Sequence, residues 1–143
     1  MRNLAKFNIP DNDMIHIYKL YIRSIVEQSC VVWGSSITEE ESLALERVQK
    51  VALRLIYLEK YTSYKHALSL SGLDKLSERR EKLSYRFAVR CTENTKTQHM
   101  FPLNEKHISN TRHPEKYKVP FSYHERLKNS AIPTMARQLN NKL

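Results

Sequence analysis

Residues 37–57 read ITEEESLALERVQKVALRLIY, and this stretch decides the fold class. Thr38 and Glu41 have the S/T-x-x-E spacing of a capping box, in which each side chain accepts a hydrogen bond from the other residue's backbone N–H. A hydrophobic residue, Ile37, comes just before the box. The sequence therefore predicts a helix from Glu39 to about Tyr57.

The predicted helix 39–57 has an apolar face and a basic face. Its apolar positions recur at three- and four-residue spacing and are Leu45, Val48, Ala52 and Leu55. Arg47, Lys50 and Arg54 project from roughly the opposite side. An amphipathic helix of this kind needs partner helices to cover its apolar face.

Helical signals also occur on both sides of this stretch. Upstream, short side chains at Asp11 to Asp13 can cap free N–H groups, which predicts a helix from there to about Val32, ended by WGSS at 33–36. The positions expected on its buried face are Met14, Tyr18, Tyr21, Ile22, Ile25, Ser29 and Val32.

Two further helices are predicted downstream. Ser63 can cap a short helix over 64–71, which Gly72 can close in the left-handed conformation. A fourth helix is expected over roughly 75–92, and its buried positions would be Leu76, Leu83, Phe87 and Cys91. Only 2 glycines and 5 prolines occur in 143 residues, which favours long elements over strands and turns.

The helical pattern weakens after residue 93. Prolines at 102, 114, 120 and 133 interrupt a stretch rich in Lys, His, Asn and Ser, with anchors expected at Phe101, Tyr117, Phe121 and Tyr123. A short last helix over about 132–140 would hold Pro133 in its first turn. We therefore expect an all-α fold, with a helical thumb-like bundle of about four helices over 1–93 and an irregular basic C-terminal arm over 94–143.

The charge of the chain is strongly positive. It has 24 Lys+Arg against 15 Asp+Glu, a formal charge of +9, and residues 94–143 contain nine basic and three acidic residues, or +6. Basic surfaces favour polyanions because neutralised phosphates release condensed counterions. The alternative is a basic protein with no nucleic-acid partner.

Helical spacing arranges part of this charge in stripes. The predicted fourth helix has one continuous basic face with a further arginine beside it, formed by Arg79, Arg80, Lys82, Arg86 and Arg90. The helix 39–57 adds Arg47, Lys50 and Arg54. We expect these residues to contact a phosphate backbone, which fixes position without reading bases. The alternative is a solvated face partly paired with Glu46, Glu78 and Glu81.

No catalytic, metal or small-molecule site is expected. Asp11 and Asp13 lie near each other, but a helix start explains them better than the Mg²⁺ site of a two-metal polymerase. His99, His107 and His113 lie in one segment, but only His107 and His113 have an H-x5-H spacing, which is at most half a zinc template because no tight cysteine pair accompanies it.

The cysteines and the hydropathy pattern favour an intracellular protein that does not enter a membrane. Cys30 and Cys91 are isolated thiols that suit a reducing compartment. We see neither a signal sequence nor a long apolar run in the sequence.

Several segments resemble one protein family. YIRSIVE at 21–27, continuing to VWG at 32–34, is similar to the "YIRSILEY…VWG" signature that follows the polymerase domain in jockey-like non-LTR retrotransposon reverse transcriptases. LERVQK at 45–50, with Ala52 and Arg54, resembles the family's "LERVQK.A.R" helix at the expected distance. Further similar positions are Tyr61, Tyr64 through Leu68, Leu73, Leu76, Arg79-Arg80, Phe101-Pro102, Arg112, Lys116-Tyr117 and Ser130 through Pro133.

The resemblance implies part of an RNA-directed DNA polymerase of a transposable element, which copies RNA into DNA with Mg²⁺. This chain would be the region after the palm, on the thumb side, and it lacks the family's Y-x-D-D aspartates. The expectation is a non-catalytic fragment, nuclear in its parent element, that binds RNA or an RNA–DNA duplex beside the polymerase core. The alternative is a helical docking or interaction module, or a degenerate element fragment with no independent activity.

Overall fold

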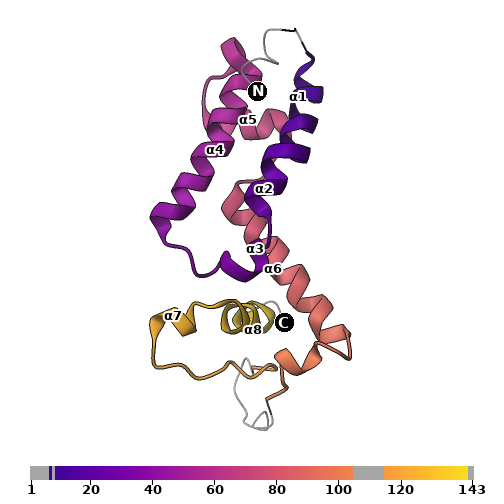
Figure 1. Cartoon of the computed structure of the whole chain (residues 1–143), viewed down its shortest axis with the longest axis vertical. Helices are drawn as coiled ribbons and strands as arrows, with labels where there is room; N and C mark the ends of the chain where they lie inside the picture. Colours follow the sequence, from indigo (N-terminus) through magenta and orange to yellow (C-terminus); the bar gives the residue numbers. More distant parts are fainter. Residues whose placement is uncertain (1–6, 8, 105–114, 142–143) are drawn as a thin grey trace. The chain divides into compact units, whose positions relative to one another are not determined.

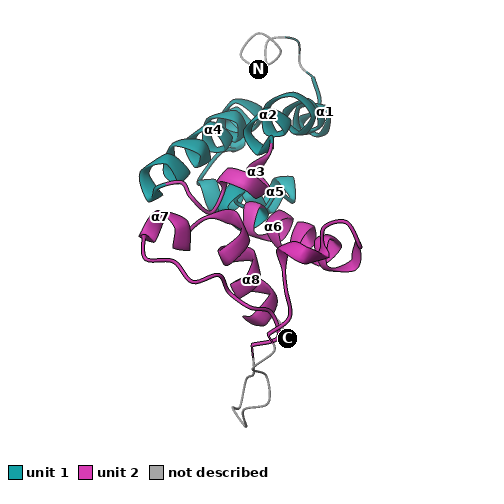
Figure 2. Cartoon of the chain, turned by 60° about the horizontal axis from the view of Figure 1, so that its bottom comes forward, with its two compact units in different colours: residues 1–28, 38–79 teal, residues 29–37, 80–143 magenta. Residues whose placement is uncertain are grey.

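The computed structural model describes residues 7, 9–104 and 115–141. These residues form an all-α fold, in which the isolated antiparallel bridge Leu103–Tyr117 is the one extended pairing within the described ranges. The chain divides into two compact units: unit 1 is residues 1–28 with 38–79, and unit 2 is residues 29–37 with 80–143 (Figure 2). This division differs from the predicted boundary between 93 and 94.

Unit 1 is built around two long helical stretches. The first contains α1 (Asp11–Ile17), a π-helical segment (Tyr18–Arg23) and α2 (Ser24–Glu27). The second is α4 (Glu39–Tyr57), followed by a 3-10 turn (Leu58–Lys60) and α5 (Tyr64–Ser71). Figure 1 shows α1 running beside α4, with α5 packed against α4. Helix α6 (Leu76–Glu93) begins in this unit and continues in unit 2.

The caps of α4 and α5 are as predicted. The Glu41 carboxylate accepts a hydrogen bond from the Thr38 backbone N–H at 2.8 Å, and the Thr38 hydroxyl oxygen accepts one from the Glu41 N–H at 3.2 Å. The Ser63 hydroxyl oxygen accepts from the His66 N–H at 3.2 Å, and Gly72 closes α5 with φ of 61°. Short-range side-chain to backbone pairing therefore sets both helix starts.

The prediction of one regular helix to Val32 was wrong. The helix changes to π-helical geometry at Tyr18, ends at Glu27, and restarts after Ser29, whose φ is 52°. A π turn winds extra residues into each turn, so positions four apart come into line and the later side chains rotate. Tyr21 and Ile25 lie in and just after this segment, and Val32 follows the break at Ser29; all three were predicted to be buried and are exposed.

The start of this helix also differs from expectation. Pro10 is the N-cap residue, and no side chain makes a capping hydrogen bond there. Asp11 and Asp13 lie instead in the first turn, where carboxylates interact favourably with the helix dipole. Asp11 accepts a hydrogen bond from Lys60 at 2.8 Å.

The core of unit 1 joins α1 to α4 and α5. It consists of Met14, Ile15, Tyr18, Ala52, Leu53, Ile56, Tyr57, Ala67, Leu68 and Leu73. The buried face of α4 is therefore rotated from the predicted one. Leu45 and Leu55 are half-buried and Val48 is 40% exposed, while Gln49 is completely buried.

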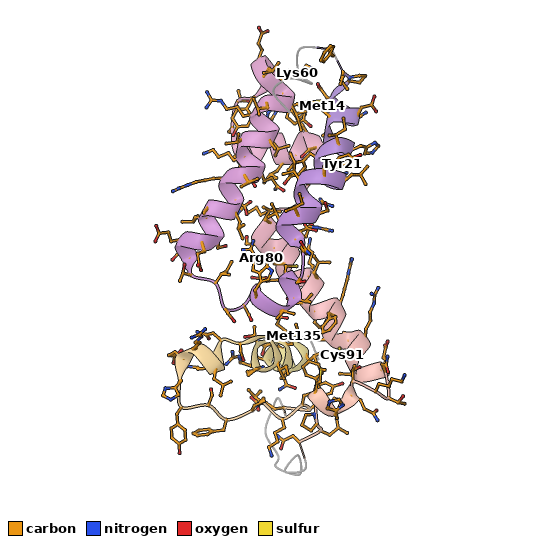
Figure 3. The ribbon with its side chains drawn as sticks, in the orientation of Figure 1. Met14, Tyr21, Lys60, Arg80, Cys91 and Met135 are labelled. Carbon is orange, nitrogen blue, oxygen red and sulfur yellow. The ribbon has the colours of Figure 1, made fainter. Side chains whose placement is uncertain are left out.

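Unit 2 has its own hydrophobic core, and the predicted arm supplies four of its six buried residues. Its elements are α3 (Cys30–Trp33), the later part of α6, a 3-10 turn (Gln98–Met100), α7 (Glu125–Lys128) and α8 (Ala131–Asn141). The core residues are Ala88, Cys91, Phe101, Met135, Ala136 and Leu139. Cys91 and Met135 are labelled in Figure 3. Residues after 94 thus belong to a packed unit because α8 covers the apolar side of α6.

Some details of unit 2 were predicted and others were not. Helix α8 contains Pro133 in its first turn, as expected, and Phe101 is buried. Tyr117 is held by Asn140, whose side chain accepts from its backbone N–H and donates to its carbonyl, both at 2.9 Å. Phe87, expected in the core, is 42% exposed, and the predicted anchors Phe121 and Tyr123 are 80% and 89% exposed.

Candidate nucleic-acid interface

The positive charge is concentrated in one unit. Unit 2 contains 13 basic and five acidic residues, a surplus of +8, whereas unit 1 contains 11 basic and 10 acidic residues, a surplus of +1. The sequence alone placed most of the surplus in residues 94–143, and the structure adds the cationic part of α6 from Arg80 onward to the same unit. The positive charge of unit 2 therefore produces an electrostatic field that attracts a polyanion.

Three of the predicted cations on α6 form an exposed stripe in unit 2. Lys82, Arg86 and Arg90 repeat every four residues, which places them on one side of the helix. All three are exposed. No carboxylate of the described ranges forms an ion pair with Arg86 or Arg90.

Arg79 does not continue this stripe. Its Nε donates to the Glu27 carboxylate at 2.5 Å, and its side chain is only 29% exposed. The same carboxylate oxygen lies 3.4 Å from Nε of Arg23. The guanidinium of Arg79 is thus part of an ion-pair cluster within unit 1. The spacing of the cations along α6 could not predict this cluster, because Glu27 and Arg23 lie on another helical stretch.

Arg80 is buried, contrary to its predicted place on the phosphate-contacting surface. It is 6% exposed and is labelled in Figure 3. Its Cδ is 3.4 Å from the point where a Cβ on Gly34 would lie, and that Cβ would come within 2.4 Å of the Cys30 carbonyl oxygen. Gly34 therefore allows the chain to pass closely between α3 and the Arg80 side chain.

The basic face of α4 is exposed, as predicted. Arg47, Lys50 and Arg54 are all in contact with solvent in unit 1. Glu46 and Glu78, which were weighed as partners for the basic faces of α4 and α6, interact with other groups. Glu46 accepts from Tyr64 and from the Leu76 N–H, and Glu78 lies 3.9 Å from Lys75.

A buried polar network crosses unit 1, and sequence reasoning missed it. The Tyr18 hydroxyl donates to Oε1 of Gln49 at 2.7 Å, while Nε2 of Gln49 donates to the Tyr64 hydroxyl at 3.0 Å and to the Asp74 carbonyl at 2.9 Å. The Tyr64 hydroxyl in turn donates to Glu46. The sequence signal for this network was a polar residue, Gln49, next to the apolar positions of α4.

This network affects the ionisation of its tyrosines. Burial raises the pKa of Tyr18 well above its ordinary value of 10.0 and outweighs the opposing effect of Arg23. Burial and then the hydrogen bond to the Glu46 carboxylate raise the pKa of Tyr64 in the same direction. Both phenols therefore stay neutral donors through the physiological range, which suits a structural role.

The surface hollows of unit 1 include an apolar groove and a larger, open hollow. One is an apolar groove of about 380 Å³ lined by Ile22, Arg47, Val48, Val51, Ala52 and Leu55. The other is an open hollow of about 1000 Å³. It lies at the end of α4 and is lined by Ile9, Asp11, Met14, Val51, Arg54, Leu55, Ile56, Tyr57, Leu58, Glu59 and Lys60.

Asp11 and Asp13, the acids weighed for a Mg²⁺ site, both lie in the first turn of α1. Asp11 is paired with Lys60, and across residues 9–104 and 115–141 no three histidine, cysteine or acidic side chains gather to hold a metal ion. His107 and His113 lie outside the described residues. No helix in the described part of the chain is long and apolar enough to cross a membrane.

In comparisons with known proteins, no family model, curated protein or solved structure matches the chain.

Proposed function

We propose that the chain binds the phosphate backbone of nucleic acid through unit 2, as a non-catalytic part of an RNA-directed DNA polymerase of the jockey-like type. The observation that carries this proposal is the division of charge, with +8 in unit 2 and +1 in unit 1. The resemblance of YIRSIVE and LERVQK to that family supplies the enzyme class and the expected ligand, an RNA–DNA duplex.

The stripe of Lys82, Arg86 and Arg90 is the proposed contact. It extends over roughly 12 Å of helix axis, because each residue adds about 1.5 Å. Each strand of a B-form duplex presents one phosphate per about 3.4 Å of helix axis, so several phosphates come within reach of the stripe. Arg47, Lys50 and Arg54 are a second, separate basic surface in unit 1. Arg79 and Arg80 are not part of the proposal, because one is ion-paired and the other is buried.

The test compares two triple variants that remove the same charge. Lys82→Ala/Arg86→Ala/Arg90→Ala removes the stripe, and Lys19→Ala/Lys65→Ala/Lys75→Ala removes three lysines from unit 1. Fluorescence anisotropy with a labelled RNA–DNA hybrid should show at least tenfold weaker binding for the first variant and a much smaller loss for the second. Equal losses would mean that net charge alone matters, and the stripe would no longer be supported.

A docking module is the second candidate, and specific observations favour it. Leu20, Tyr21 and Ile25 are 70%, 67% and 72% exposed on the first helical stretch, and the apolar groove beside Val48 and Val51 lies in the same unit. Exposed apolar surface of this kind marks interaction sites. The partner would be the polymerase core of the parent enzyme.

Light scattering separates this candidate from the first. A docking module should self-associate as its concentration rises, and Leu20→Lys/Ile25→Lys should return it to a monomer. A chain that stays monomeric and has no affinity for nucleic acid would instead fit a degenerate fragment with no independent activity.

A further inference from the structure

Two aromatic side chains of unit 2 lie side by side in solvent. Phe121 and Tyr123 are 80% and 89% exposed, and their ring centroids are 4.9 Å apart with an interplanar angle of 86°. This is the edge-to-face arrangement that aromatic pairs prefer. Their exposed ring faces offer apolar surface that the core of unit 2 does not use.

The backbone holds the pair in place from both ends. Before it, Tyr117 is bonded to Asn140, and the Lys118 N–H donates to the Pro102 carbonyl at 2.9 Å. After it, α7 starts at Glu125, and the Leu127 N–H bonds to the His124 carbonyl. Because the segment is already anchored, its backbone loses little conformational entropy when a ligand binds, and this favours a ligand-binding role for the two rings.

Basic residues flank the pair in the sequence. Residues 115–128 contain four basic and two acidic residues, and one of the acids, Glu125, pairs with Lys128 at 3.0 Å. Lys116, Lys118 and Arg126 are exposed, and Nζ of Lys116 lies 5.5 Å from the centre of the Tyr117 ring. Flat rings with cations nearby in the sequence suit a ligand that has flat apolar groups on an anionic backbone. An apolar protein surface is a poorer match, because it has no negative charge to pair with the cations.

We propose that Phe121 and Tyr123 stack on unpaired bases of single-stranded nucleic acid, whose phosphates contact Lys116, Lys118 and Arg126. This inference rests on the proposed function and extends it from duplex backbone to single strand. Stacking on aromatic side chains tolerates any base, because every base has a flat π face. The segment that contains Phe121 and Tyr123 would thus bind the single strand that extends from the end of a duplex.

The experiment uses 12-nucleotide oligo(U), oligo(dT) and an abasic strand with the same number of phosphates. The full chain should bind both base-containing strands roughly five- to a hundredfold more tightly than the abasic strand. Phe121→Ala/Tyr123→Ala should abolish this advantage and leave binding of the abasic strand unchanged. A preference between oligo(U) and oligo(dT) would show whether RNA or DNA is the natural strand.

Two controls keep the result interpretable. Phe7→Ala removes a ring of unit 1 that is 75% exposed and should leave the base-dependent advantage intact. Phe121→Trp should retain the affinity, and its indole fluorescence should fall when oligo(dT) binds but not when the abasic strand binds. Circular dichroism establishes that each variant is folded, which is expected because both rings are exposed.

The two proposals fail in different ways. Equal affinity of the full chain for oligo(dT) and the abasic strand, or an advantage that survives Phe121→Ala/Tyr123→Ala, overturns the stacking proposal. Loss of the α6 stripe should weaken binding of every strand, the abasic one included. If no single strand binds measurably, the stacking proposal is wrong, and if the RNA–DNA hybrid does not bind either, the proposed function is wrong as well.

Discussion

At the scale of single residues, the buried amide of Gln49 connects α4 to three other parts of unit 1. It accepts from Tyr18 on the first helical stretch and donates to Tyr64 on α5 and to the Asp74 carbonyl before α6. A buried amide is tolerated only when its hydrogen bonds are made, so these helices must meet in one register. The polar network therefore specifies how the core of unit 1 packs.

Replacing Gln49 with leucine should destabilise unit 1 strongly. The Tyr18 hydroxyl and the Asp74 carbonyl would lose a partner, and each unsatisfied buried group costs about 1–3 kcal/mol. We expect the free energy of unfolding, measured by urea denaturation, to fall by roughly 3 kcal/mol. Lys50→Ala, on the exposed side of the same helix, should change it by less than about 0.5 kcal/mol. A similar small change for Gln49→Leu would show that the network does not hold the unit together.

The tyrosines of this network predict a loss of stability at alkaline pH. The pKa of Tyr18 is higher in the folded chain than its ordinary value of 10.0, because burial disfavours the phenolate. The folded state therefore retains a proton that the unfolded chain releases, so stability is full below pH 10 and falls above it. The fall can reach about 1.4 kcal/mol per pH unit for each such tyrosine.

Urea denaturation between pH 9 and about 11.5 measures this effect. Tyr18→Phe should start from a lower stability, because Oε1 of Gln49 loses its donor, but its stability should fall less steeply with pH. An unchanged slope in Tyr18→Phe would mean that Tyr18 ionises normally in the folded chain.

At the scale of elements, the capping box fixes where α4 begins. Thr38→Ala removes the oxygen that accepts the Glu41 N–H, and we expect the unfolding free energy to drop by about 1 kcal/mol. Thr38→Ser keeps that oxygen and should restore most of the loss. Thermal denaturation followed by circular dichroism measures both. Equal melting temperatures for the alanine and serine variants would contradict this account of the helix start.

The sequence predicts elements whose determinants are local and fails where they are not. Ser63, Gly72 and the Thr38–Glu41 pair act within four residues, so the start of α4 and both ends of α5 followed directly from them. The π-helical segment from Tyr18 to Arg23 carries no comparable local signal, and it rotates Tyr21 and Ile25 into solvent. The face of α4 was also misread, because tertiary hydrogen bonds to Gln49 decide which side is buried.

The sequence also predicted only some of the exposed cations of the candidate interface correctly. Spacing alone put Lys82, Arg86 and Arg90 on one side of α6, and they are exposed there. Spacing could not show that Arg79 finds Glu27, 52 positions earlier, or that Arg80 is covered in unit 2. Whether a cation faces solvent depends on partners that are distant in the sequence.

At the scale of the whole molecule, each unit has its own core and the charge is concentrated in one of them. Unit 2 buries Met135, Ala136 and Leu139 of α8 against Ala88 and Cys91 of α6. The C-terminal third is therefore a structural component of the basic unit. Any surface that α6 presents for binding depends on that core being formed.

Met135→Ala tests whether α8 stabilises unit 2. Truncating a buried methionine costs about 2–5 kcal/mol, and the core should open more often. Cys30 and Cys91 are free thiols buried in this unit, so both should react faster with a thiol reagent. Ile132→Ala changes a 39% exposed residue of the same helix and should leave the reaction rate nearly unchanged. Equal rates for the two variants would imply that α8 contributes little to the core.

The salt dependence of binding tests the central claim, that unit 2 holds a phosphate backbone, most directly. The affinity for an RNA–DNA hybrid should fall linearly with salt on logarithmic axes, with a slope of roughly 0.7–0.9 per phosphate contacted. Lys82→Ala/Arg86→Ala/Arg90→Ala should flatten that slope by about two units or more, whereas Lys19→Ala/Lys65→Ala/Lys75→Ala should leave it almost unchanged. A slope near zero for the full chain, or the same slope for all three proteins, would contradict the account.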